Sequence, residues 1–455
     1  MNTEYSVTRR SFMKSVGFTT AASSLAGTVS RPAQPATGSA GKPALLGGTP
    51  VHQGPWPSWP QEGPPDEAIM MKALQEKRWC YLRSGAHFCR DYEKQLGSDY
   101  GGAHVMLTNA GTTALHACLY AMDIGPGDEV LVTGESFIAT MQSILNLFAL
   151  PIFVDVDRAT GLMDADLLEQ AVTPHTKAIM PVHLYGAACD MDKVMAVAKK
   201  HNLKVIEDAC QSPYVEWDGH KLGTIGDCGA VSFNVWKTLG CGEGGMIVTT
   251  DDKVAQTCDA FRNNGRTSGA DIGFMGMNYR PTEFQAALLL TQTEQYKRQA
   301  PVRQRNAAFL DRGLAQIPGL NPFKVYAKTR YHNYYNYLMH YDAEAMGGLP
   351  IDRFTKALSA EGIPCGSDSN ADIMSHHKSL DRLYQTRHFR DVCTPEQLKR
   401  AEASRACPRA LHLVRTQVDF SQSLLLGSQS DMETILEAVE RIRKHAGELM
   451  KTQAE

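Results

Sequence analysis

The sequence lacks the cysteine spacing of a metal site and any strong excess of one charge. Its eleven cysteines are scattered and odd in number, and they form neither CxxC pairs nor clusters with histidine. They are therefore expected to be reduced core residues of a chain that folds in a reducing compartment. The net charge of −3 and a pI near 6.6 give no general attraction to nucleic acid or an anionic membrane. A small-molecule partner is expected instead.

Internal repeats and long apolar runs are also missing. Residues 15–29 form a weakly apolar run that is too short and too polar to span a membrane. This run follows residues 8–14 (TRRSFMK), and the two together resemble a twin-arginine export signal. Because that route exports folded proteins, free cysteines are compatible with a periplasmic destination. The alternative is a disordered basic tail on a cytoplasmic protein.

Hydrophobic residues make up 43% of the whole sequence, which is enough to fill sizeable cores, and a length of 455 residues suits two or three domains. Residues 30–48 are rich in Pro, Ala, Gly and Ser and predict a linker, with the signal and linker assigned to 1–40 and any cleavage near Ala40. An N-terminal arm is expected over 41–65, where residues 56–60 (WPSWP) exclude regular structure.

Strands and helices alternate over residues 66–300, the predicted large domain. Expected helices cover 66–77, 114–122 and 191–201, and expected strands cover 105–107, 129–132, 152–154, 178–182 and 204–206. This alternation predicts an α/β fold with a mixed, mostly parallel sheet that helices cover on both faces. Ligands then bind at the carboxyl ends of the strands.

A long helix is expected over 282–299, and the pattern changes from about Pro301. Residues 301–455 predict a smaller C-terminal α+β domain with an aromatic strand over 331–341 and helices over 351–360 and 431–449. The tyrosines of that strand would stack on a ligand or simply pack, and packing is the preferred interpretation.

Lys237 is the candidate nucleophile, because it lies on a glycine-rich loop between two apolar runs in residues 231–250 (VSFNVWKTLGCGEGGMIVTT). Asp208 ends a buried strand, where its carboxylate can pair with a cationic ring nitrogen. Small residues and hydroxyls at 109–113 open a helix and expose N–H groups to a phosphate, and Ser232 adds a donor. A phosphate cradle, a ring-nitrogen carboxylate and a Schiff-base lysine are together what pyridoxal phosphate requires.

Three other signals have simpler explanations. The glycine run at 240–245 (GCGEGG) opens a strand, whereas a dinucleotide-binding turn opens a helix. His183 at a buried strand end would contact substrate or simply be hydrogen-bonded, and the second is preferred. His376 and His377 lack acidic or cysteine companions at ligand spacing, so no metal is expected.

Several blocks resemble the DegT/DnrJ/StrS family of sugar and cyclitol aminotransferases. They are LTNAGTTALHACLYAMDIGPGDEVLV, TPHTKAIMPVHLYGAACDMD, VIEDACQS, GDCGAVSFNVWKTLGCGEGG and GMNYRPTEFQAALL, and the resemblance covers about residues 44–443. It implies the fold type I architecture of enzymes that use pyridoxal 5'-phosphate, and a homodimer with shared active sites.

The resemblance also implies roles for individual residues. Lys237 matches the lysine that binds the cofactor covalently, and Asp208 matches the partner of the pyridine nitrogen. Gln211 matches the residue beside the ring and its hydroxyl, and Ser232 matches a phosphate ligand.

Four further positions complete the implied cofactor site. Gly111 and Thr112 match the phosphate turn, and Phe137 resembles the aromatic residue that stacks on the ring. Asn278 resembles the residue that reaches the phosphate from the other subunit. Arg280 is a weaker match, because Pro281 follows where methionine is common in the family.

The implied reaction is transamination in aminosugar biosynthesis. Glutamate or glutamine gives its amino group to the cofactor, which then aminates a nucleotide-linked keto-sugar or a ketocyclitol. Some relatives carry histidine in place of the lysine and dehydrate sugars, so Lys237 favours transamination. A cofactor-binding sensor or scaffold without turnover is the other alternative. Residues 363–377 are expected near the substrate. The stretch 362–374 (GIPCGSDSNADIM) departs from the histidine-containing pattern of many nucleotide-sugar relatives, which points to an unusual substrate.

Overall fold

A seven-stranded sheet forms the centre of the computed structural model, which describes residues 41–82, 85–266 and 273–451. The predicted export signal lies outside these residues. The strand order is β1-β9-β8-β5-β4-β2-β3, with antiparallel pairing of β9 to β1 and β8 and parallel pairing elsewhere. The strands are β1 (His104–Thr108), β2 (Glu129–Thr133), β3 (Leu150–Val154), β4 (Thr176–Met180), β5 (Lys204–Asp208), β8 (Cys228–Ser232) and β9 (Gly245–Thr249).

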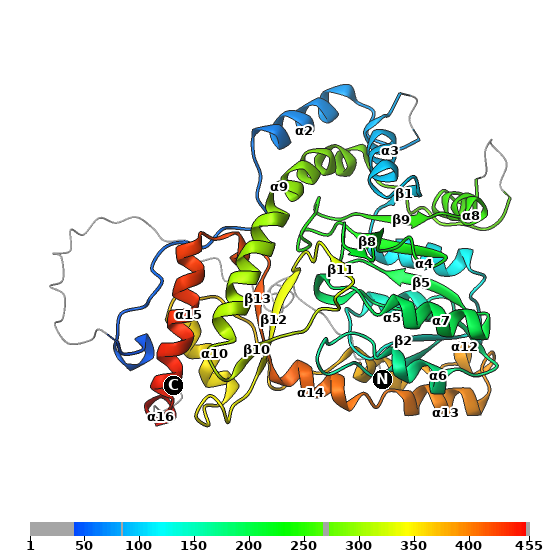
Figure 1. Ribbon diagram of the computed structural model, residues 1–455. Helices are drawn as coiled ribbons and strands as arrows, with labels where there is room; N and C mark the ends of the chain where they lie inside the picture. The colour runs from blue at the N-terminus through cyan, green and yellow to red at the C-terminus, as the bar shows by residue number, and fades with distance from the viewer. Residues whose placement is uncertain (1–40, 83–84, 267–272, 452–455) are drawn as a thin grey trace, which may run out of the picture. The chain divides into compact units, whose positions relative to one another are not determined.

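Helices cover this sheet, as Figure 1 shows for α4, α5 and α7. Four strands (β2, β3, β8 and β9) are buried along their whole length, because helices exclude water from them. The predicted α/β fold with a mostly parallel sheet is confirmed. The helices of this part are α2 (Pro64–Glu76), α3 (Phe88–Asp99), α4 (Gly111–Ala121), α5 (Ala139–Leu145), α6 (Leu168–Ala171), α7 (Met191–His201) and α8 (Asp252–Arg262).

The helix that the sequence predicts over 282–299 is longer than expected. Helix α9 (Glu283–Leu314) begins at a capping box of Thr282 and Gln285 and continues through Pro301. The predicted end was wrong, because a proline removes one helical N–H while packing on both sides of it holds the helix together. Helices α2 and α3 pack against α9, and so does α15 (Gln429–Lys444). The predicted boundary at residue 300 falls inside this helix, and the division into two domains stays a prediction.

A second, three-stranded sheet lies beside α9 (Figure 1). It is antiparallel, in the order β10 (Leu320–Pro322), β12 (Asn336–Tyr341), β13 (Gln417–Ser421). Its hydrophobic cluster includes residues of α9, α10 (Ile351–Ala360), α15 and α16 (Ala446–Leu449), separate from the cluster around the large sheet. The helix that the sequence predicts over 431–449 is in fact two helices, α15 and α16, which are separated by a break at His445.

Only the second half of the predicted aromatic strand 331–341 is a strand. Tyr331 and Tyr334 have φ angles of 57° and 53°, in the left-handed region that a strand excludes. The Asn333 side chain donates to the carbonyl of Gln211 at 3.1 Å, which binds this irregular segment to the large sheet. A small ribbon of β6 (Glu216–Trp217), β7 (His220–Lys221) and β11 (Thr329–Arg330) adjoins it.

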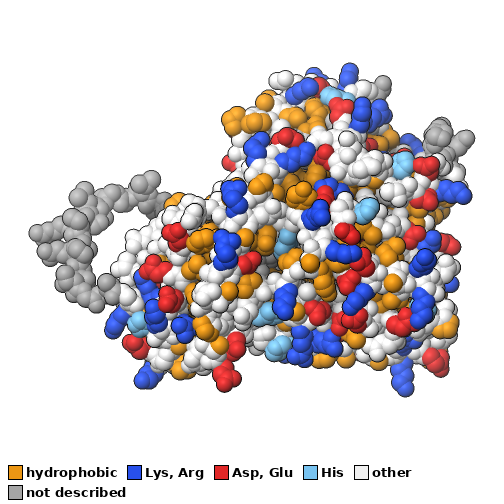
Figure 2. All heavy atoms as spheres, viewed as in Figure 1, with side chains coloured by type: hydrophobic (Ala, Val, Ile, Leu, Met, Phe, Trp, Pro, Cys, Tyr) orange, Lys and Arg blue, Asp and Glu red, His pale blue; other side chains and the backbone are white. Residues whose placement is uncertain are grey.

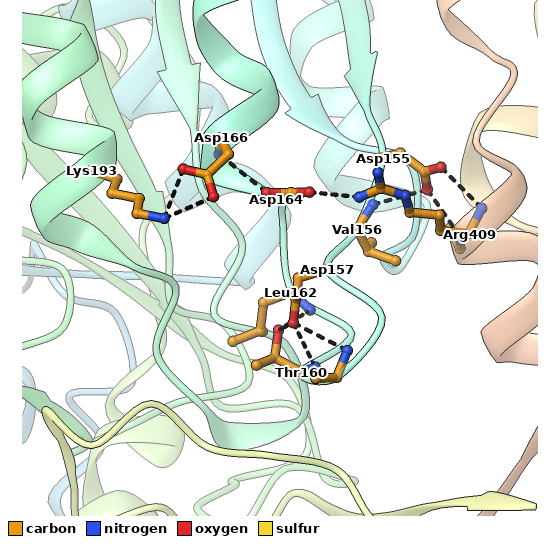
Figure 3. A network of polar contacts seen from close by, with 11 residues as sticks. Asp155, Val156, Asp157, Thr160, Leu162, Asp164, Asp166, Lys193 and Arg409 are labelled. Carbon is orange, nitrogen blue, oxygen red and sulfur yellow. Dashed lines mark hydrogen bonds and ion pairs between the residues drawn. The ribbon is translucent and has the colours of Figure 1, made fainter.

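The C-terminal part of the chain also covers the β3 edge of the large sheet, where α13 packs (Figure 1). Figure 3 shows Asp155 beside Arg409. The Asp155 carboxylate accepts hydrogen bonds from the backbone N–H groups of Arg409 and Ala410, both at 2.9 Å, at the start of α14 (Pro408–Thr416). Arg409 pairs with Asp164 at 2.6 Å, so these acids serve a structural purpose. The helices here are α11 (Ser379–Leu383), α12 (Arg387–Arg390), α13 (Pro395–Ser404) and α14 (Pro408–Thr416).

The N-terminal arm binds to the body through specific hydrogen bonds. The buried Glu361 carboxylate accepts from the N–H groups of Ala44 at 2.9 Å and Val51 at 3.0 Å. The end of the predicted linker 30–48 is therefore ordered, with a short 3₁₀ helix at Ala44–Leu46. Trp59 donates from its indole N–H to the carbonyl of Val235 at 2.7 Å, as expected for an arm that lies over the body.

The surface carries both signs of charge. Figure 2 shows Lys and Arg interspersed with Asp and Glu over the viewed face, in line with the small net charge. Within residues 41–82, 85–266 and 273–451, no helix combines the length and the hydropathy that a bilayer crossing requires. All eleven cysteines are unpaired, and Cys80 is exposed, contrary to the expectation that they all lie in the core.

Candidate active site

A cavity of about 750 Å³ opens at the carboxyl ends of the parallel strands of the large sheet. It gathers seven of the eight site residues that the sequence predicts: Gly111, Thr112, Phe137, Asp208, Gln211, Ser232 and Lys237. They come from segments between residues 111 and 237 that the crossover connections bring to one edge of the sheet.

Lys237 lies on the loop between β8 and β9. Its N–H donates to the carbonyl of Asn234 at 2.9 Å, and the N–H of Phe233 donates to the carbonyl of Gly244 at 2.8 Å, which closes the glycine-rich turn behind the lysine. The Nζ atom lies 4.2 Å from the ring centroid of Tyr335. In the part of the chain that the structure describes, this ammonium has no carboxylate within ion-pair distance and is open to the cavity.

Asp208 ends β5 with a carboxylate that is only 3% exposed. One oxygen accepts from the Thr140 hydroxyl at 2.7 Å and the other from the N–H of Cys210 at 3.1 Å. No lysine, arginine or histidine of the described residues forms an ion pair with it. A buried carboxylate without a cation is costly, so the site favours a ligand that brings a positive group.

The N-terminus of α4 faces the same cavity. Its first residues, Gly111 and Thr112, line the cavity, and Ala110 provides no side-chain cap. A Cβ on Gly111 would lie 2.8 Å from the Cβ of Ser232, so only glycine allows this close approach. Free N–H groups at a helix N-terminus, together with the Ser232 hydroxyl, suit an anion such as phosphate.

Two further predicted residues line the cavity walls. Gln211 is buried, and its Oε1 accepts from the N–H of Tyr185 at 2.7 Å. Phe137, just before α5, is 67% exposed, so its ring is free to cover a ligand. A large exposed aromatic side chain at a cavity is typical of a binding site.

Asn278 is the predicted residue that lies outside the cavity. It is exposed and pairs with Asn263 in an isolated antiparallel bridge. Arg280 donates to the Asn263 side chain at 3.0 Å, also away from the cavity. Within a single chain, Asn278 and Arg280 therefore both lie outside the cavity.

His183 is hydrogen-bonded in the core, as the sequence analysis preferred. It is fully buried, and its Nε2 lies 3.0 Å from the Glu207 carboxylate. Glu207 also accepts from the N–H groups of Gly223, Ile225 and Gly226 at 2.7–2.8 Å. This pair fixes the ends of β4 and β5 beneath the site.

Sequence reasoning missed three residues of the site. Tyr335 was assigned to a packed strand, but the left-handed turns before it direct its ring to Lys237. Thr140 carries no motif, and only the fold reveals its contact with Asp208. Glu135, two residues before Phe137, carries no motif of its own. Burial, partly offset by the N–H of Met374, raises its pKa from 4.5 to about 7, and Asp372 adds to the rise.

The comparisons with known proteins agree with this geometry. Residues 65–414 match the model of the DegT/DnrJ/EryC1/StrS aminotransferase family. The L-glutamine:2-deoxy-scyllo-inosose aminotransferase of Streptoalloteichus tenebrarius is 35% identical over 424 residues, 89% of this chain and 98% of that protein. The GDP-perosamine synthase of Caulobacter vibrioides is 42% identical over 239 residues, 52% of this chain and 64% of that protein.

The fold agrees as well. The crystal structure of 3-amino-5-hydroxybenzoic acid synthase superposes with a TM-score of 0.75 at 26% identity, covering 87% of this chain and 99% of that one. The family match extends over the cavity and all the predicted site residues. The chain belongs to the DegT/DnrJ/EryC1/StrS aminotransferase family.

Proposed function

We propose that this chain transfers the amino group of L-glutamine to the keto group of a cyclitol or sugar, with pyridoxal 5'-phosphate as the cofactor. One observation carries the proposal. Lys237, with no carboxylate partner among the described residues, and Asp208, with no cation partner there, face one cavity beside an uncapped helix N-terminus. A buried carboxylate without a positive partner costs free energy, and a ligand can supply that partner. Together the three features match a ligand with a cationic ring for Asp208, a phosphate for the helix N-terminus and an aldehyde for Lys237.

The residues present fit that cofactor. The uncapped start of α4, the Ser232 hydroxyl and the close approach at Gly111 form a cradle for the phosphate. Asp208 would hold the proton on the ring nitrogen, and Thr140 fixes its carboxylate. Lys237 would form the covalent attachment. A volume of about 750 Å³ leaves space for a substrate beside the cofactor.

When bound, the cofactor withdraws electrons from the carbon that bears the amino group. Lys237, released from its covalent attachment when the amino donor takes its place, would then act as the base that takes a proton from this carbon and delivers it to the carbon on the other side of the nitrogen. The Tyr335 ring, 4.2 Å from Nζ, keeps the ammonium in the cavity by a cation–π contact. Phe137 would cover the open face of the site and exclude water from it.

The relatives support the substrate class. The cyclitol aminotransferase of Streptoalloteichus tenebrarius matches over almost its whole length and uses L-glutamine, whereas the nucleotide-sugar enzyme of Caulobacter vibrioides matches over 64% of its length. We therefore place ketocyclitols first and nucleotide-linked keto-sugars second. A cofactor-binding protein without turnover, or a sugar dehydratase, has no specific support in the site.

Isotope transfer tests the proposed function. The purified, cofactor-loaded protein is incubated with L-glutamine labelled with ¹⁵N at the α-amino group and with 2-deoxy-scyllo-inosose, and the products are identified by mass spectrometry. We expect a labelled aminocyclitol. A panel of nucleotide-linked keto-sugars is run in parallel. If no keto substrate gives a labelled amine, the proposed function is wrong.

We also propose that two chains form a homodimer with shared active sites. Asn278 is exposed and outside the cavity of its own chain, which suits a residue that acts in a partner's site. Light scattering of the purified protein measures the oligomeric state. Asn278→Ala should weaken cofactor binding without changing the absorbance of the bound form. A monomer that is fully active would refute the shared site.

Export to the periplasm is a further proposal, and its support is the TRRSFMK segment at residues 8–14. Fusion of residues 1–48 to a reporter that functions only after folded export tests it. Replacement of Arg9 and Arg10 by lysine should abolish export. Equal export of both fusions would show that Arg9 and Arg10 do not direct export, and export of neither would favour a cytoplasmic protein.

A further inference from the structure

The Glu135 carboxyl lies where two cavities meet. It follows β2 at the carboxyl edge of the sheet and lines the cavity that contains Lys237. It also lines a neighbouring cavity of about 390 Å³, whose other walls include Asp372, His376 and Lys378. The carboxyl therefore lines the space that a substrate beside a bound cofactor would occupy.

The loop that carries Glu135 is fixed in place. The N–H of Gly134 donates to the carbonyl of Val154 at 2.9 Å, and its carbonyl accepts from the N–H of Ser375 at 3.0 Å. A Cβ on Gly134 would lie 2.4 Å from the Cys407 Sγ, so the backbone approaches closely here. Such a loop holds the carboxyl at a constant distance from the sheet, as substrate recognition requires.

Side-chain hydrogen bonds also tie this loop to Asp208. The Ser136 hydroxyl lies 2.9 Å from the Thr140 hydroxyl, which donates to the Asp208 carboxylate at 2.7 Å. Because Thr140 uses its hydrogen for Asp208, Ser136 donates to Thr140. The position of Glu135 is thereby linked to the carboxylate proposed to hold the cofactor ring.

The Glu135 carboxyl has unused hydrogen-bonding capacity. Its Oε2 accepts from the N–H of Met374 at a long 3.3 Å, and its Oε1 has no partner in the described ranges. No basic side chain of those ranges forms an ion pair with it, and His376 is instead 2.8 Å from Asp372. Burial raises its pKa to about 7, so about half of these carboxyls are protonated at neutral pH, and the protonated form both donates and accepts hydrogen bonds.

We propose that Glu135 recognises hydroxyl groups on the ring of the keto substrate and thereby selects polyhydroxylated carbocycles or sugars. A hydroxyl both donates and accepts, as a protonated carboxyl at this position does, and it brings no charge to a cavity that three acids already line, namely Glu135, Asp208 and Glu243. The inference rests on the proposed transamination, because it names what the same site binds. Glu135 acts on substrate affinity and leaves the reaction of the amino donor to Lys237.

Binding of an unreactive polyol tests this role. Calorimetry measures the affinity of the cofactor-loaded protein for scyllo-inositol, which carries ring hydroxyls and no keto group. Glu135→Leu should lose about tenfold or more in affinity, because it removes the hydrogen bonds between the carboxyl and the ring hydroxyls. Glu135→Gln, which keeps a donor and an acceptor, should stay within about threefold.

A second variant and a distant control keep the test decisive if Glu135→Leu fails to fold. Glu135→Asp retracts the carboxyl by one methylene and should raise the KM for the keto substrate more than it raises the KM for glutamine. Glu440→Gln, on the exposed face of α15, should change neither value.

Two outcomes separate the inference from the function on which it rests. If the wild-type protein aminates a keto substrate but binds scyllo-inositol no better than Glu135→Leu or Glu135→Asp does, the role of Glu135 is wrong and the transamination stands. If the wild-type protein aminates no ketocyclitol or keto-sugar at all, the proposed function fails first.

Discussion

Removal of the half-buried acid Glu135 should change how stability depends on pH. Its carboxyl has a pKa of about 7 in the folded protein against an ordinary value of 4.5, with burial as the main cause. Between these values the folded chain binds more protons than the unfolded chain, so the free energy of unfolding falls as the pH rises. Each pKa unit corresponds to about 1.4 kcal/mol, which gives a loss of up to about 3 kcal/mol between pH 4.5 and 7.

Glu135→Gln removes this loss, because glutamine does not titrate. Relative to the wild type, the variant should therefore gain up to about 3 kcal/mol between pH 4.5 and 8, with most of the gain complete near pH 7. Urea unfolding of the cofactor-loaded proteins, followed by circular dichroism at several pH values, measures the difference.

An exposed glutamate provides the matched control. Lys444 lowers the pKa of Glu440 below its ordinary value, so Glu440→Gln should give a difference that is constant above pH 5. Parallel stability curves for the wild type and Glu135→Gln would show that Glu135 is not a desolvated acid, and the reasoning about its hydrogen-bonding capacity would fall with it.

Two further substitutions test the cofactor cradle. Thr140→Val removes the 2.7 Å hydrogen bond to Asp208 and should lower kcat/KM by about tenfold or more, since a hydrogen bond to a charged group contributes about 1.5–3 kcal/mol, whereas Thr140→Ser keeps the hydroxyl and most of the activity. Gly111→Ala places a Cβ 2.8 Å from the Ser232 Cβ and should weaken cofactor binding measured by absorbance titration, while Gly447→Ala, which meets open space, should not. Wild-type activity in Thr140→Val, or wild-type cofactor affinity in Gly111→Ala, would contradict the site.

The large sheet was predictable because its strands are short apolar runs separated by helical patterns. A strand that is covered by helices on both faces is apolar along its whole length, so the apolar run in the sequence indicates the buried strand. That Lys237 and Asp208 lie close together was predictable from the sheet, because residues that follow the carboxyl ends of parallel strands meet at one edge. The structure places both at one cavity.

The remaining features depend on contacts between distant segments, which the local pattern does not contain. Helix α9 passes Pro301 because packing on both sides outweighs one lost hydrogen bond. Tyr335 reaches Lys237 only because Tyr331 and Tyr334 adopt left-handed conformations that no local motif indicates. Glu135 stands beside the predicted Phe137, but its burial by the 372–378 segment is a property of the fold.

Lys237 as the covalent anchor of the cofactor is tested most directly by chemical trapping. The cofactor-loaded protein is reduced with borohydride, digested, and analysed by mass spectrometry to find the lysine that carries the pyridoxyl group. We expect the pyridoxyl group on Lys237. In Lys237→Ala we expect neither this modification nor the visible absorbance of the bound cofactor. A pyridoxyl group on a different lysine, or none on a protein that still turns over, would contradict the proposed site.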